Sequence, residues 1–187
     1  MKRIAIFASG SGSNAENIIS YFSNSKIATV TNVYCNKKGA KVFDRCKRLK
    51  VNCSLFSRDD FFESNAIASQ LKQTADLIIL AGFLWKIPTH IIADFPNSII
   101  NIHPALLPKY GGKGMYGMHV HKAVKANNET ETGITIHYVN EHYDEGAIIF
   151  QAKTAVNSED TPDTIAQKIH TLEQEHFPKV IASLIAN

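Results

Sequence analysis

The sequence lacks any apolar run long enough to cross a membrane. Its longest candidate, around Leu77 to Leu80, has the length of a strand, whereas a membrane helix needs about 18 or more apolar residues. A secretory leader is also missing, because Met1 to Ala8 lead into a strand pattern without a longer apolar stretch and small-residue cleavage site. We therefore expect a cytoplasmic protein that makes no contact with a membrane.

Cysteine and charge of one sign are equally scarce. Cys35, Cys46 and Cys53 are odd in number and show no C-x-x-C spacing, which is typical of reduced structural thiols rather than of disulfides or a zinc site. The formal net charge is only +3, and the Lys and Arg residues are scattered, so the basic footprint of a nucleic-acid-binding protein is missing. A small anionic substrate is compatible with this charge.

What is present is an alternating α/β pattern over 187 residues, of which 44% are hydrophobic. This length is enough for one core, and we expect a single domain over residues 1–187. Alternation of strand and helix patterns predicts a doubly wound, mostly parallel sheet of about seven strands with helices on both faces. The predicted strands are Arg3 to Phe7, Ala28 to Tyr34, Asn52 to Phe56, Leu77 to Ala81, Ile99 to Ile102, Thr132 to Tyr138 and Ala147 to Lys153.

Helix patterns separate these runs. A closing helix starts near Thr161, and Pro178 should kink or split it. Glycines crowd the segment from Gly111 to Met118, which predicts an irregular loop that acts either as a lid or as a contact with another subunit. The other predicted helices are Asn14 to Ser25, Ala40 to Lys50, Asp59 to Gln73 and Pro88 to Phe95.

A glycine-rich turn, Ser9 to Ala15, directly follows the first predicted strand. Its glycines allow a tight turn, and the next helix presents unpaired N–H groups to an anion, so the turn predicts phosphate binding. The pattern also fits a loose dinucleotide fingerprint, but Cys35 to Lys38 offer no acid for an NAD ribose, which leaves only a cofactor with a 2′-phosphate. The simpler alternative is a turn in which Ser13 or Asn14 caps the helix.

Polar residues gather where the fifth predicted strand ends. Asn101 and His103 are two residues apart, so both side chains point to the same side, at the edge where doubly wound sheets bind ligands. An amide donor and an imidazole that can carry charge suit the oxyanion of an acyl transfer. Asp144, between the last two predicted strands, is the candidate carboxylate that would favour the imidazolium and orient it. The alternative is that the Asn and His only satisfy loop backbone, with Asp144 in a β-turn.

Three other histidines are weaker candidates. His119 and His121 form an H-x-H pair, but no Cys or carboxylate stands at ligand spacing, so we expect no metal and a supporting place near the substrate. His137 alternates with Thr135 along a strand, which favours a satisfied, semi-buried histidine with a possible supporting role beside Asp144.

Together these motifs resemble those of the phosphoribosylglycinamide formyltransferase family, within the folate-dependent formyltransferases, over nearly the whole length. The resemblance rests on four segments: Ala8 to Asn14, Leu80 to Phe83, Asn101 to Pro108, and Gly133 to Asp144 with Gly146. It implies a Rossmann-like formyltransferase fold and transfer of the formyl group of 10-formyltetrahydrofolate to the amine of glycinamide ribonucleotide in purine biosynthesis. It also implies that no metal and no covalent enzyme intermediate take part.

The resemblance further implies roles for particular residues. Asn101, His103 and Asp144 form the catalytic set, in which Asn101 and protonated His103 stabilise a tetrahedral oxyanion while Asp144 holds His103 charged and assists proton transfer. Glu173 contacts the ribose or glycinamide end of the substrate. The residues implied for the substrate phosphate are Gly12, Ser13 and Asn14, and those for folate are Arg58, Leu84, Trp85, Lys86, Ile87, Asn101, Val139, Asn140, Glu141, His142, Tyr143 and Asp144.

The sequence departs from the family pattern at three places. Trp85 and Lys86 stand where a basic and then an apolar residue are expected, Ala105 replaces a common Ser, and the segment from Gly111 to Met118 is longer than usual. The simpler interpretation of Arg58 is a solvated side chain rather than a folate contact.

Other functions stay open beside this one. The rivals are another folate-dependent formyltransferase, formyltetrahydrofolate hydrolase, and a nucleotide-binding module without catalysis. Length argues against the tRNA enzyme and the hydrolase, which carry additional domains, and the phosphate turn favours a phosphorylated substrate. The expected partners are small molecules, and a monomer and a homodimer are both compatible with the sequence.

Overall fold

The structure, a computed structural model, describes residues 1–186 and divides into two compact units. Unit 1 comprises Met1–Ile100 and the residues from Ile181 onward, and unit 2 comprises Asn101–Val180. We describe each unit by itself, and the expectation of a single domain stays a prediction. Among residues 1–186, no helix combines the length and apolar character that a membrane span requires.

Seven strands form one sheet in the order β3-β2-β1-β4-β5-β6-β7. β1 pairs in parallel with both β2 and β4, and β2 pairs in parallel with β3, whereas β6 and β7 are antiparallel. The predicted fold class, a doubly wound and mostly parallel sheet, is therefore confirmed. The strands are β1 Lys2–Ala8, β2 Ala28–Cys35, β3 Cys53–Leu55, β4 Leu77–Leu80, β5 Ile99–His103, β6 Glu131–Tyr138 and β7 Ile148–Ala155.

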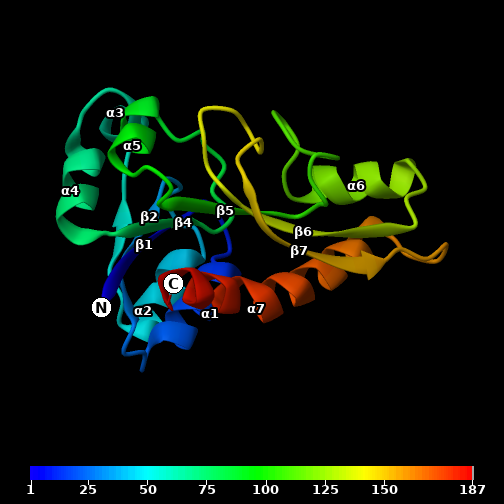
Figure 1. Ribbon diagram of the computed structural model, residues 1–187, viewed down its shortest axis with the longest axis horizontal. Coiled ribbons are helices and arrows are strands. Elements are labelled where there is room, and N and C mark those ends of the chain that lie inside the picture. The colour runs from blue at the N-terminus through cyan, green and yellow to red at the C-terminus, as the bar shows by residue number, and fades with distance from the viewer. Residues whose placement is uncertain (187) are drawn as a thin grey trace. The chain divides into compact units, whose positions relative to one another are not determined.

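Unit 1 has helices on both sides of its parallel strands (Figure 1). α1 and α2 lie on one side, and α3, α4 and α5 lie on the other. Strand β1 runs through the centre, and Ile4 to Ala8 are fully buried. The helices of this unit are α1 Ser13–Phe22, α2 Val42–Leu49, α3 Arg58–Phe62, α4 Ala66–Thr74 and α5 Thr89–Asp94.

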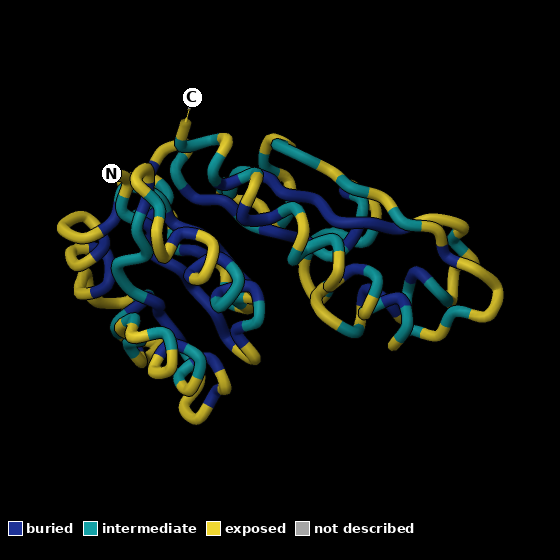
Figure 2. Tube along the Cα trace, turned by 90° about the horizontal axis from the view of Figure 1, so that it is seen from below, coloured by how far each residue is buried: buried dark blue, intermediate teal, exposed yellow. Residues whose placement is uncertain are grey.

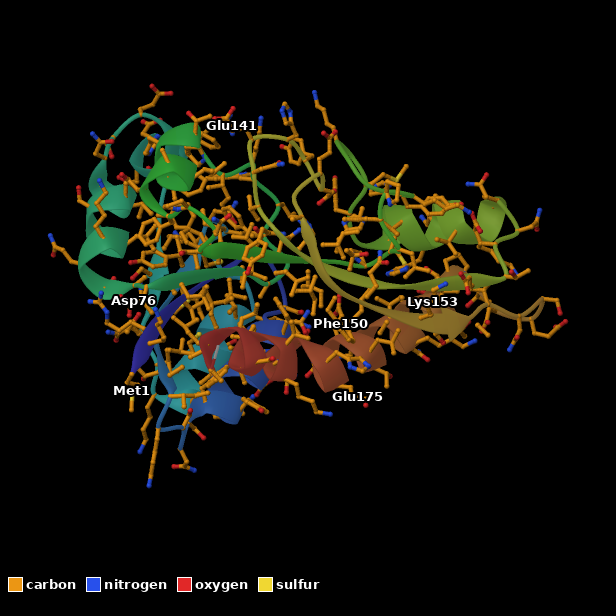
Figure 3. The ribbon with its side chains drawn as sticks, in the orientation of Figure 1. Met1, Asp76, Glu141, Phe150, Lys153 and Glu175 are labelled. Atoms are coloured by element: carbon orange, nitrogen blue, oxygen red, sulfur yellow. The ribbon has the colours of Figure 1, made fainter. Side chains whose placement is uncertain are left out.

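Unit 2 is built on the antiparallel pair β6–β7. Helix α6, Met118–Ala126, lies on one side of this pair, and α7, Pro162–Ala186, lies on the other (Figure 1). Phe150 of β7 points toward α7, where its ring centroid lies 5.0 Å from that of His176 (Figure 3). Apolar side chains of α7 at Ile165, Ile169 and Phe177 are buried and complete the core of this unit.

Burial is concentrated in β1, β4, β5 and β6, whereas the edge strands β3 and β7 hold only half-buried and exposed residues. In Figure 2 the buried residues form continuous stretches of the trace, and exposed residues gather at the loop tips. The three cysteines are free thiols, of which Cys35 and Cys46 are buried and Cys53 is half-buried.

One predicted helix is divided in two. The segment expected as a single helix, Asp59 to Gln73, forms α3 and α4, with Glu63 to Asn65 between them. The Ser64 Oγ donates to the carbonyl oxygen of Asp60 and accepts from the N–H of Ala66. A side chain that bonds nearby backbone in this way competes with the helix, which explains the break.

Two further helix predictions differ from the structure. Helix α6 was not predicted. The glycines before Met118 indicated a loop, and the helical spacing of the buried residues Val120 and Val124 is too short to stand out in the sequence. The predicted split at Pro178 is wrong, since α7 continues through it from Pro162 to Ala186. Phe177 is fully buried, and this burial offsets the one backbone hydrogen bond that the proline cannot donate.

The β6–β7 pair depends on a residue without a side chain at Gly133. A Cβ atom at this position would collide with the backbone carbonyl of Ala152 and lie 2.7 Å from Leu106 Cδ2. We expect Gly133→Ala to lower the free energy of unfolding by about 3 kcal/mol, because the clash is with backbone that cannot rotate away. Urea denaturation measures this change. Gly10→Ala is the control, because nothing lies within 4 Å of its added methyl group, and an equal loss in both variants would contradict the explanation.

Candidate active site

The glycine-rich turn of unit 1 packs against helix α2. Gly12 adopts a left-handed conformation, with φ of 73°, and a Cβ atom here would lie 2.5 Å from Val42 Cγ2. The Val42 N–H donates to the Gly10 carbonyl oxygen over 3.3 Å, and Arg45 Nε donates to that of Ser11 over 2.8 Å. Helix α2 therefore fixes the path of the turn.

The turn leads directly into helix α1. Helix α1 begins at Ser13, and the preceding Gly12 makes no side-chain capping hydrogen bond. The alternative in which Ser13 or Asn14 caps the helix stays open. Glu16 in the first turn forms ion pairs with Arg45 and Arg48 of α2, so its negative charge is countered at the end of the helix where an anion would bind.

The predicted folate segment of unit 1 is joined to Arg58 by aromatic contacts. The Arg58 guanidinium carbon lies 4.6 Å from the ring centroid of Phe62 and 5.7 Å from that of Trp85. Trp85 in turn contacts the rings of Phe56, Phe61 and Phe83. The structure thus brings Arg58 and Trp85 together, and the tryptophan that departs from the family pattern is anchored in an aromatic cluster.

The other members of this segment differ in exposure. Leu84 is 53% exposed and Lys86 is exposed, whereas Ile87 is buried. The Leu84 N–H donates to Ser9 Oγ over 3.0 Å, and the Ser9 N–H donates to the Gly82 carbonyl oxygen over 3.1 Å. These bonds join the end of β1 to the segment that follows β4.

In unit 2, strand β5 ends at the predicted catalytic residues. His103 is 4% exposed, and its Nε2 lies 2.7 Å from the backbone carbonyl oxygen of Tyr110. Because a carbonyl oxygen only accepts, Nε2 carries a proton and donates it. The other ring nitrogen, Nδ1, lies 3.6 Å from Asp144 Oδ2, which is longer than a normal hydrogen bond.

Asp144 reaches this position through a strained turn. Its backbone lies in the left-handed region, with φ of 56°, which non-glycine residues adopt at a cost and most often at functional sites. The Gly112 N–H donates to Asp144 Oδ2 over 2.9 Å. A side chain at Gly146 would collide with the carbonyl of Tyr138. The glycines on both sides thus allow the carboxylate to approach His103.

Burial and charge act in opposite directions on the pair. Burial lowers the pKa of His103, while the Asp144 carboxylate and the Tyr110 carbonyl oppose this shift. Burial raises the pKa of Asp144, but the neighbouring His137 side chain, the charge of His103 and the Gly112 N–H outweigh that effect, so its pKa lies below the ordinary value. Asp144 is therefore ionised at neutral pH.

His137 adds a third polar group to this cluster. It is 2% exposed, and its Nδ1 donates to the Tyr138 carbonyl oxygen over 2.8 Å. Its Nε2 lies 3.2 Å from Asn101 Nδ2 and 3.6 Å from Asp144 Oδ1. The neutral ring therefore accepts a hydrogen bond from Asn101 and orients its amide. The structure thus brings Asn101, His103 and Asp144 together, with His137 among them.

Thr135 holds the backbone after His103, a role that was not predicted from the sequence. Thr135 Oγ1 donates to the carbonyl oxygen of Ala105 over 2.7 Å and accepts from the Leu107 N–H over 3.0 Å. Gln151 Nε2 donates to the same hydroxyl over 2.9 Å and to the Leu107 carbonyl oxygen over 3.1 Å. The sequence signal for this role is a threonine within an otherwise apolar strand, because such a residue needs a hydrogen-bond partner when it is buried.

The loop after β6 carries the remaining predicted folate residues. Val139 and Asn140 are half-buried, while Glu141, His142 and Tyr143 are exposed. Glu141 lies at the outer part of this loop in Figure 3. Asn140 stabilises a turn in this loop, because its Oδ1 accepts a hydrogen bond from the His142 N–H over 2.9 Å. Asp144 of this segment reaches the cluster around His103.

Glu173 and the H-x-H pair lie on the helices of unit 2. Glu173 Oε2 on α7 lies 3.6 Å from His170 Nδ1. On α6, His119 is exposed, whereas His121 is buried, and burial lowers the pKa of His121 while Glu173 opposes that shift. Within residues 1–186, no group of three or more His, Cys, Asp or Glu side chains is arranged to hold a metal ion.

A doubly wound sheet with a buried His and a half-buried Asn at a strand end, beside a loop Asp, is typical of an α/β enzyme that acts on an acyl group. Residues 2–181 match the formyl transferase family. The chain belongs to this family.

Known relatives agree with this assignment. The chain is 36% identical to phosphoribosylglycinamide formyltransferase of Bacillus subtilis, over 99% of this chain and 95% of that protein. It is 35% identical to the chloroplastic phosphoribosylglycinamide formyltransferase of Arabidopsis thaliana, of whose length it spans 65%. The crystal structure of phosphoribosylglycinamide formyltransferase from Bacillus halodurans superposes with a TM-score of 0.88 at 33% identity, covering 100% of this chain and 96% of that one.

The opposing effects on His103 predict the result of removing the carboxylate. Because Asp144 opposes the effect of burial, Asp144→Asn should move the already lowered pKa of His103 down by about one unit or more. Histidine NMR titration of the free protein measures this value. Glu131→Gln, which removes a carboxylate that pairs with Lys153 instead, serves as the control. A His103 titration unchanged by the substitution would contradict the electrostatic coupling.

Proposed function

We propose that this chain transfers the formyl group of 10-formyltetrahydrofolate to the amine of glycinamide ribonucleotide, a step of purine biosynthesis. The observation that carries the proposal is the cluster of buried His103 with half-buried Asn101 and Asp144, in which Asp144 Oδ2 lies 3.6 Å from His103 Nδ1. Membership of the formyl transferase family and the name of the Bacillus subtilis relative support the choice of reaction.

In this proposal the formyl folate supplies an activated acyl carbon, which the amine of the ribonucleotide attacks. The amide of Asn101 and the Nδ1–H of protonated His103 donate to the oxygen on which negative charge develops. Nδ1 suits this role because Nε2 is already committed to the Tyr110 carbonyl oxygen. Asp144 stabilises the imidazolium and assists proton transfer from the attacking amine. His103 can then return its proton to the departing folate nitrogen.

The phosphate of the ribonucleotide is assigned to the turn at Gly12, Ser13 and Asn14. The start of helix α1 at Ser13 and the tight backbone at Gly12 support this assignment. Arg45 and Arg48 add positive charge beside the turn. Glu173 is assigned to the ribose or glycinamide end of the substrate.

The folate assignment rests on chemistry that the residues offer. Arg58 is a cation positioned over Phe62 and Trp85, and such a group fits the carboxylates of a folate tail. Leu84, Trp85, Lys86 and Ile87 provide apolar contact, and Asn101 and Val139 to Asp144 provide polar groups for the pterin. No metal is required by this scheme. A cytoplasmic location and a monomeric or homodimeric state belong to the same proposal.

The proposal is tested by following folate product by absorbance, with 10-formyltetrahydrofolate present and glycinamide ribonucleotide either added or left out. Product that depends on the ribonucleotide is the expected result. Release of folate without it would indicate a hydrolase instead. Absence of product in both mixtures would contradict this reaction and favour another acceptor or a binding module.

His103→Ala separates catalysis from binding. We expect kcat to fall roughly 100-fold or more, the scale of losing one oxyanion donor. The dissociation constant of the ribonucleotide should change little, because the phosphate is assigned to other residues. Steady-state kinetics and calorimetry measure the two quantities. A kcat equal to that of the unaltered protein would remove His103 from the mechanism.

A further inference from the structure

Glu129, in the turn between α6 and β6, joins two residues of the loop that follows the Asn101 to Pro108 motif. Its Oε1 accepts from the Tyr110 hydroxyl over 2.8 Å and from Lys109 Nζ over 2.9 Å, and its Oε2 lies 3.2 Å from the same Nζ. The hydrogen bonds from Lys109 and then Tyr110 hold the pKa of Glu129 below its ordinary value. The Glu129 N–H also donates to the Val124 carbonyl oxygen over 3.3 Å, which attaches the carboxylate to the end of α6.

The backbone of Tyr110 is at once strained and in contact with His103. Its φ of 57° lies in the left-handed region, where a tyrosine stays only if its surroundings hold it there. The next residue has no room to adjust, since a Cβ atom at Gly111 would lie 2.6 Å from Leu107 Cδ2 and 3.3 Å from Asp144 Cβ. The carbonyl oxygen of Tyr110 is the group that accepts from His103 Nε2 over 2.7 Å.

We propose that Glu129 is a positioning residue: through the Tyr110 hydroxyl it holds the Tyr110 carbonyl oxygen against His103 Nε2, and thereby keeps Nδ1 as the ring nitrogen that exchanges a proton. A neutral imidazole carries its proton on one of two nitrogens, and the partner of one nitrogen decides the state of the other. A carbonyl oxygen at Nε2 selects the Nε2–H form. The nitrogen near Asp144 is then free to gain and lose a proton.

The charged groups around His103 support this assignment. Asp144 faces Nδ1, and His137 lies on the far side of Asp144 at 3.6 Å. The effects on the pKa of His103, after burial, are those of Asp144, of the Tyr110 carbonyl and of His137. The Tyr110 carbonyl raises this pKa, so loss of its hydrogen bond should lower it. Glu129 thus acts on catalysis through the proton on His103 and not by contact with substrate.

A role of Glu129 in stability alone would give a different experimental result. If the bonds among Lys109, Tyr110 and Glu129 only held the loop, breaking them would lower stability and leave the tautomer and pKa of His103 as they were. The decisive measurement is therefore the state of the His103 ring in the free protein. It requires no substrate, so it stands apart from the test of the proposed reaction, although the catalytic meaning of the inference rests on that proposed function.

The experiment compares Tyr110→Phe, Glu129→Gln and the double variant in 15N-histidine-labelled protein, by long-range 1H–15N NMR over a pH titration. In the unaltered protein, neutral His103 should be in the Nε2–H form. Tyr110→Phe removes the hydroxyl, so we expect a mixture of both neutral forms and a pKa lower by about half a unit or more. Glu129→Gln keeps an amide oxygen that accepts from Tyr110, so its effect should be smaller.

Glu131→Gln is the matched control. Glu131 is two residues away and pairs with Lys153 over 2.8 Å, so this variant loses the same charge without losing the bond to Tyr110. It should leave the His103 signals unchanged. At His103 the double variant should resemble Tyr110→Phe alone, because in this proposal Glu129 acts on His103 through the Tyr110 hydroxyl, so the two effects on His103 are not additive.

Kinetics give the second readout. With the formyl-transfer assay, Tyr110→Phe should lower kcat at neutral pH by roughly 3- to 10-fold, in proportion to the lost protonated form, with little change in KM. The acidic shift should appear in the pH profile of kcat. His103 signals in Tyr110→Phe and Glu129→Gln that superimpose on those of the unaltered protein would overturn the inference, whatever the stability of the variants. Failure of the assay alone would contradict the proposed reaction and leave the NMR result to decide the positioning role.

Discussion

The active-site part of unit 2 depends on one buried imidazole placed between two acceptors. His103 donates from Nε2 to the Tyr110 carbonyl oxygen, and its Nδ1 faces the Asp144 carboxylate. Burial alone would favour the neutral form of the His103 ring, because a charged group loses its hydration in the protein interior. The Asp144 carboxylate and the Tyr110 carbonyl oxygen stabilise the charged ring and so offset part of the lost hydration. A proton can therefore reside on Nδ1 or leave it at modest cost, which is what a group needs if it is to act as both acid and base.

Much of the surrounding backbone can be understood as what is needed to bring these acceptors to the ring. Asp144 and Tyr110 both adopt left-handed conformations, and Gly112 and Gly146 allow the close approaches that the two residues require. Thr135 fixes the chain just after His103 by bonding Ala105 and Leu107. Strain in the loops is thus balanced by hydrogen bonds from the rigid strands, as is common where a catalytic group must be held in one orientation.

The sequence was sufficient to predict the sheet, its strands and the placement of Asn101 and His103 on one side, because these follow from strand period and from the rule that ligands bind at strand ends. Asp144 was predicted as their partner from the resemblance to the formyltransferase family. The sequence was insufficient for α6, hidden behind a run of glycines, and for the break at Ser64, where a side chain competes with the helix. Pro178 continues a helix because Phe177 beside it is fully buried. The part played by Tyr110 could not be predicted, since it rests on a backbone carbonyl whose position no residue type reveals. The roles assigned to individual site residues stay predictions.

The aromatic cluster of unit 1 has a practical consequence. The chain contains one tryptophan, Trp85, so all of its indole emission originates from a single place. That place adjoins the Arg58 guanidinium, 5.7 Å from the ring centroid, and belongs to the segment assigned to folate. A charged neighbour shifts the energy of an indole excited state, and a carboxylate that drew Arg58 away would change that shift. The protein therefore carries a built-in optical reporter whose colour responds to its surroundings without any attached dye.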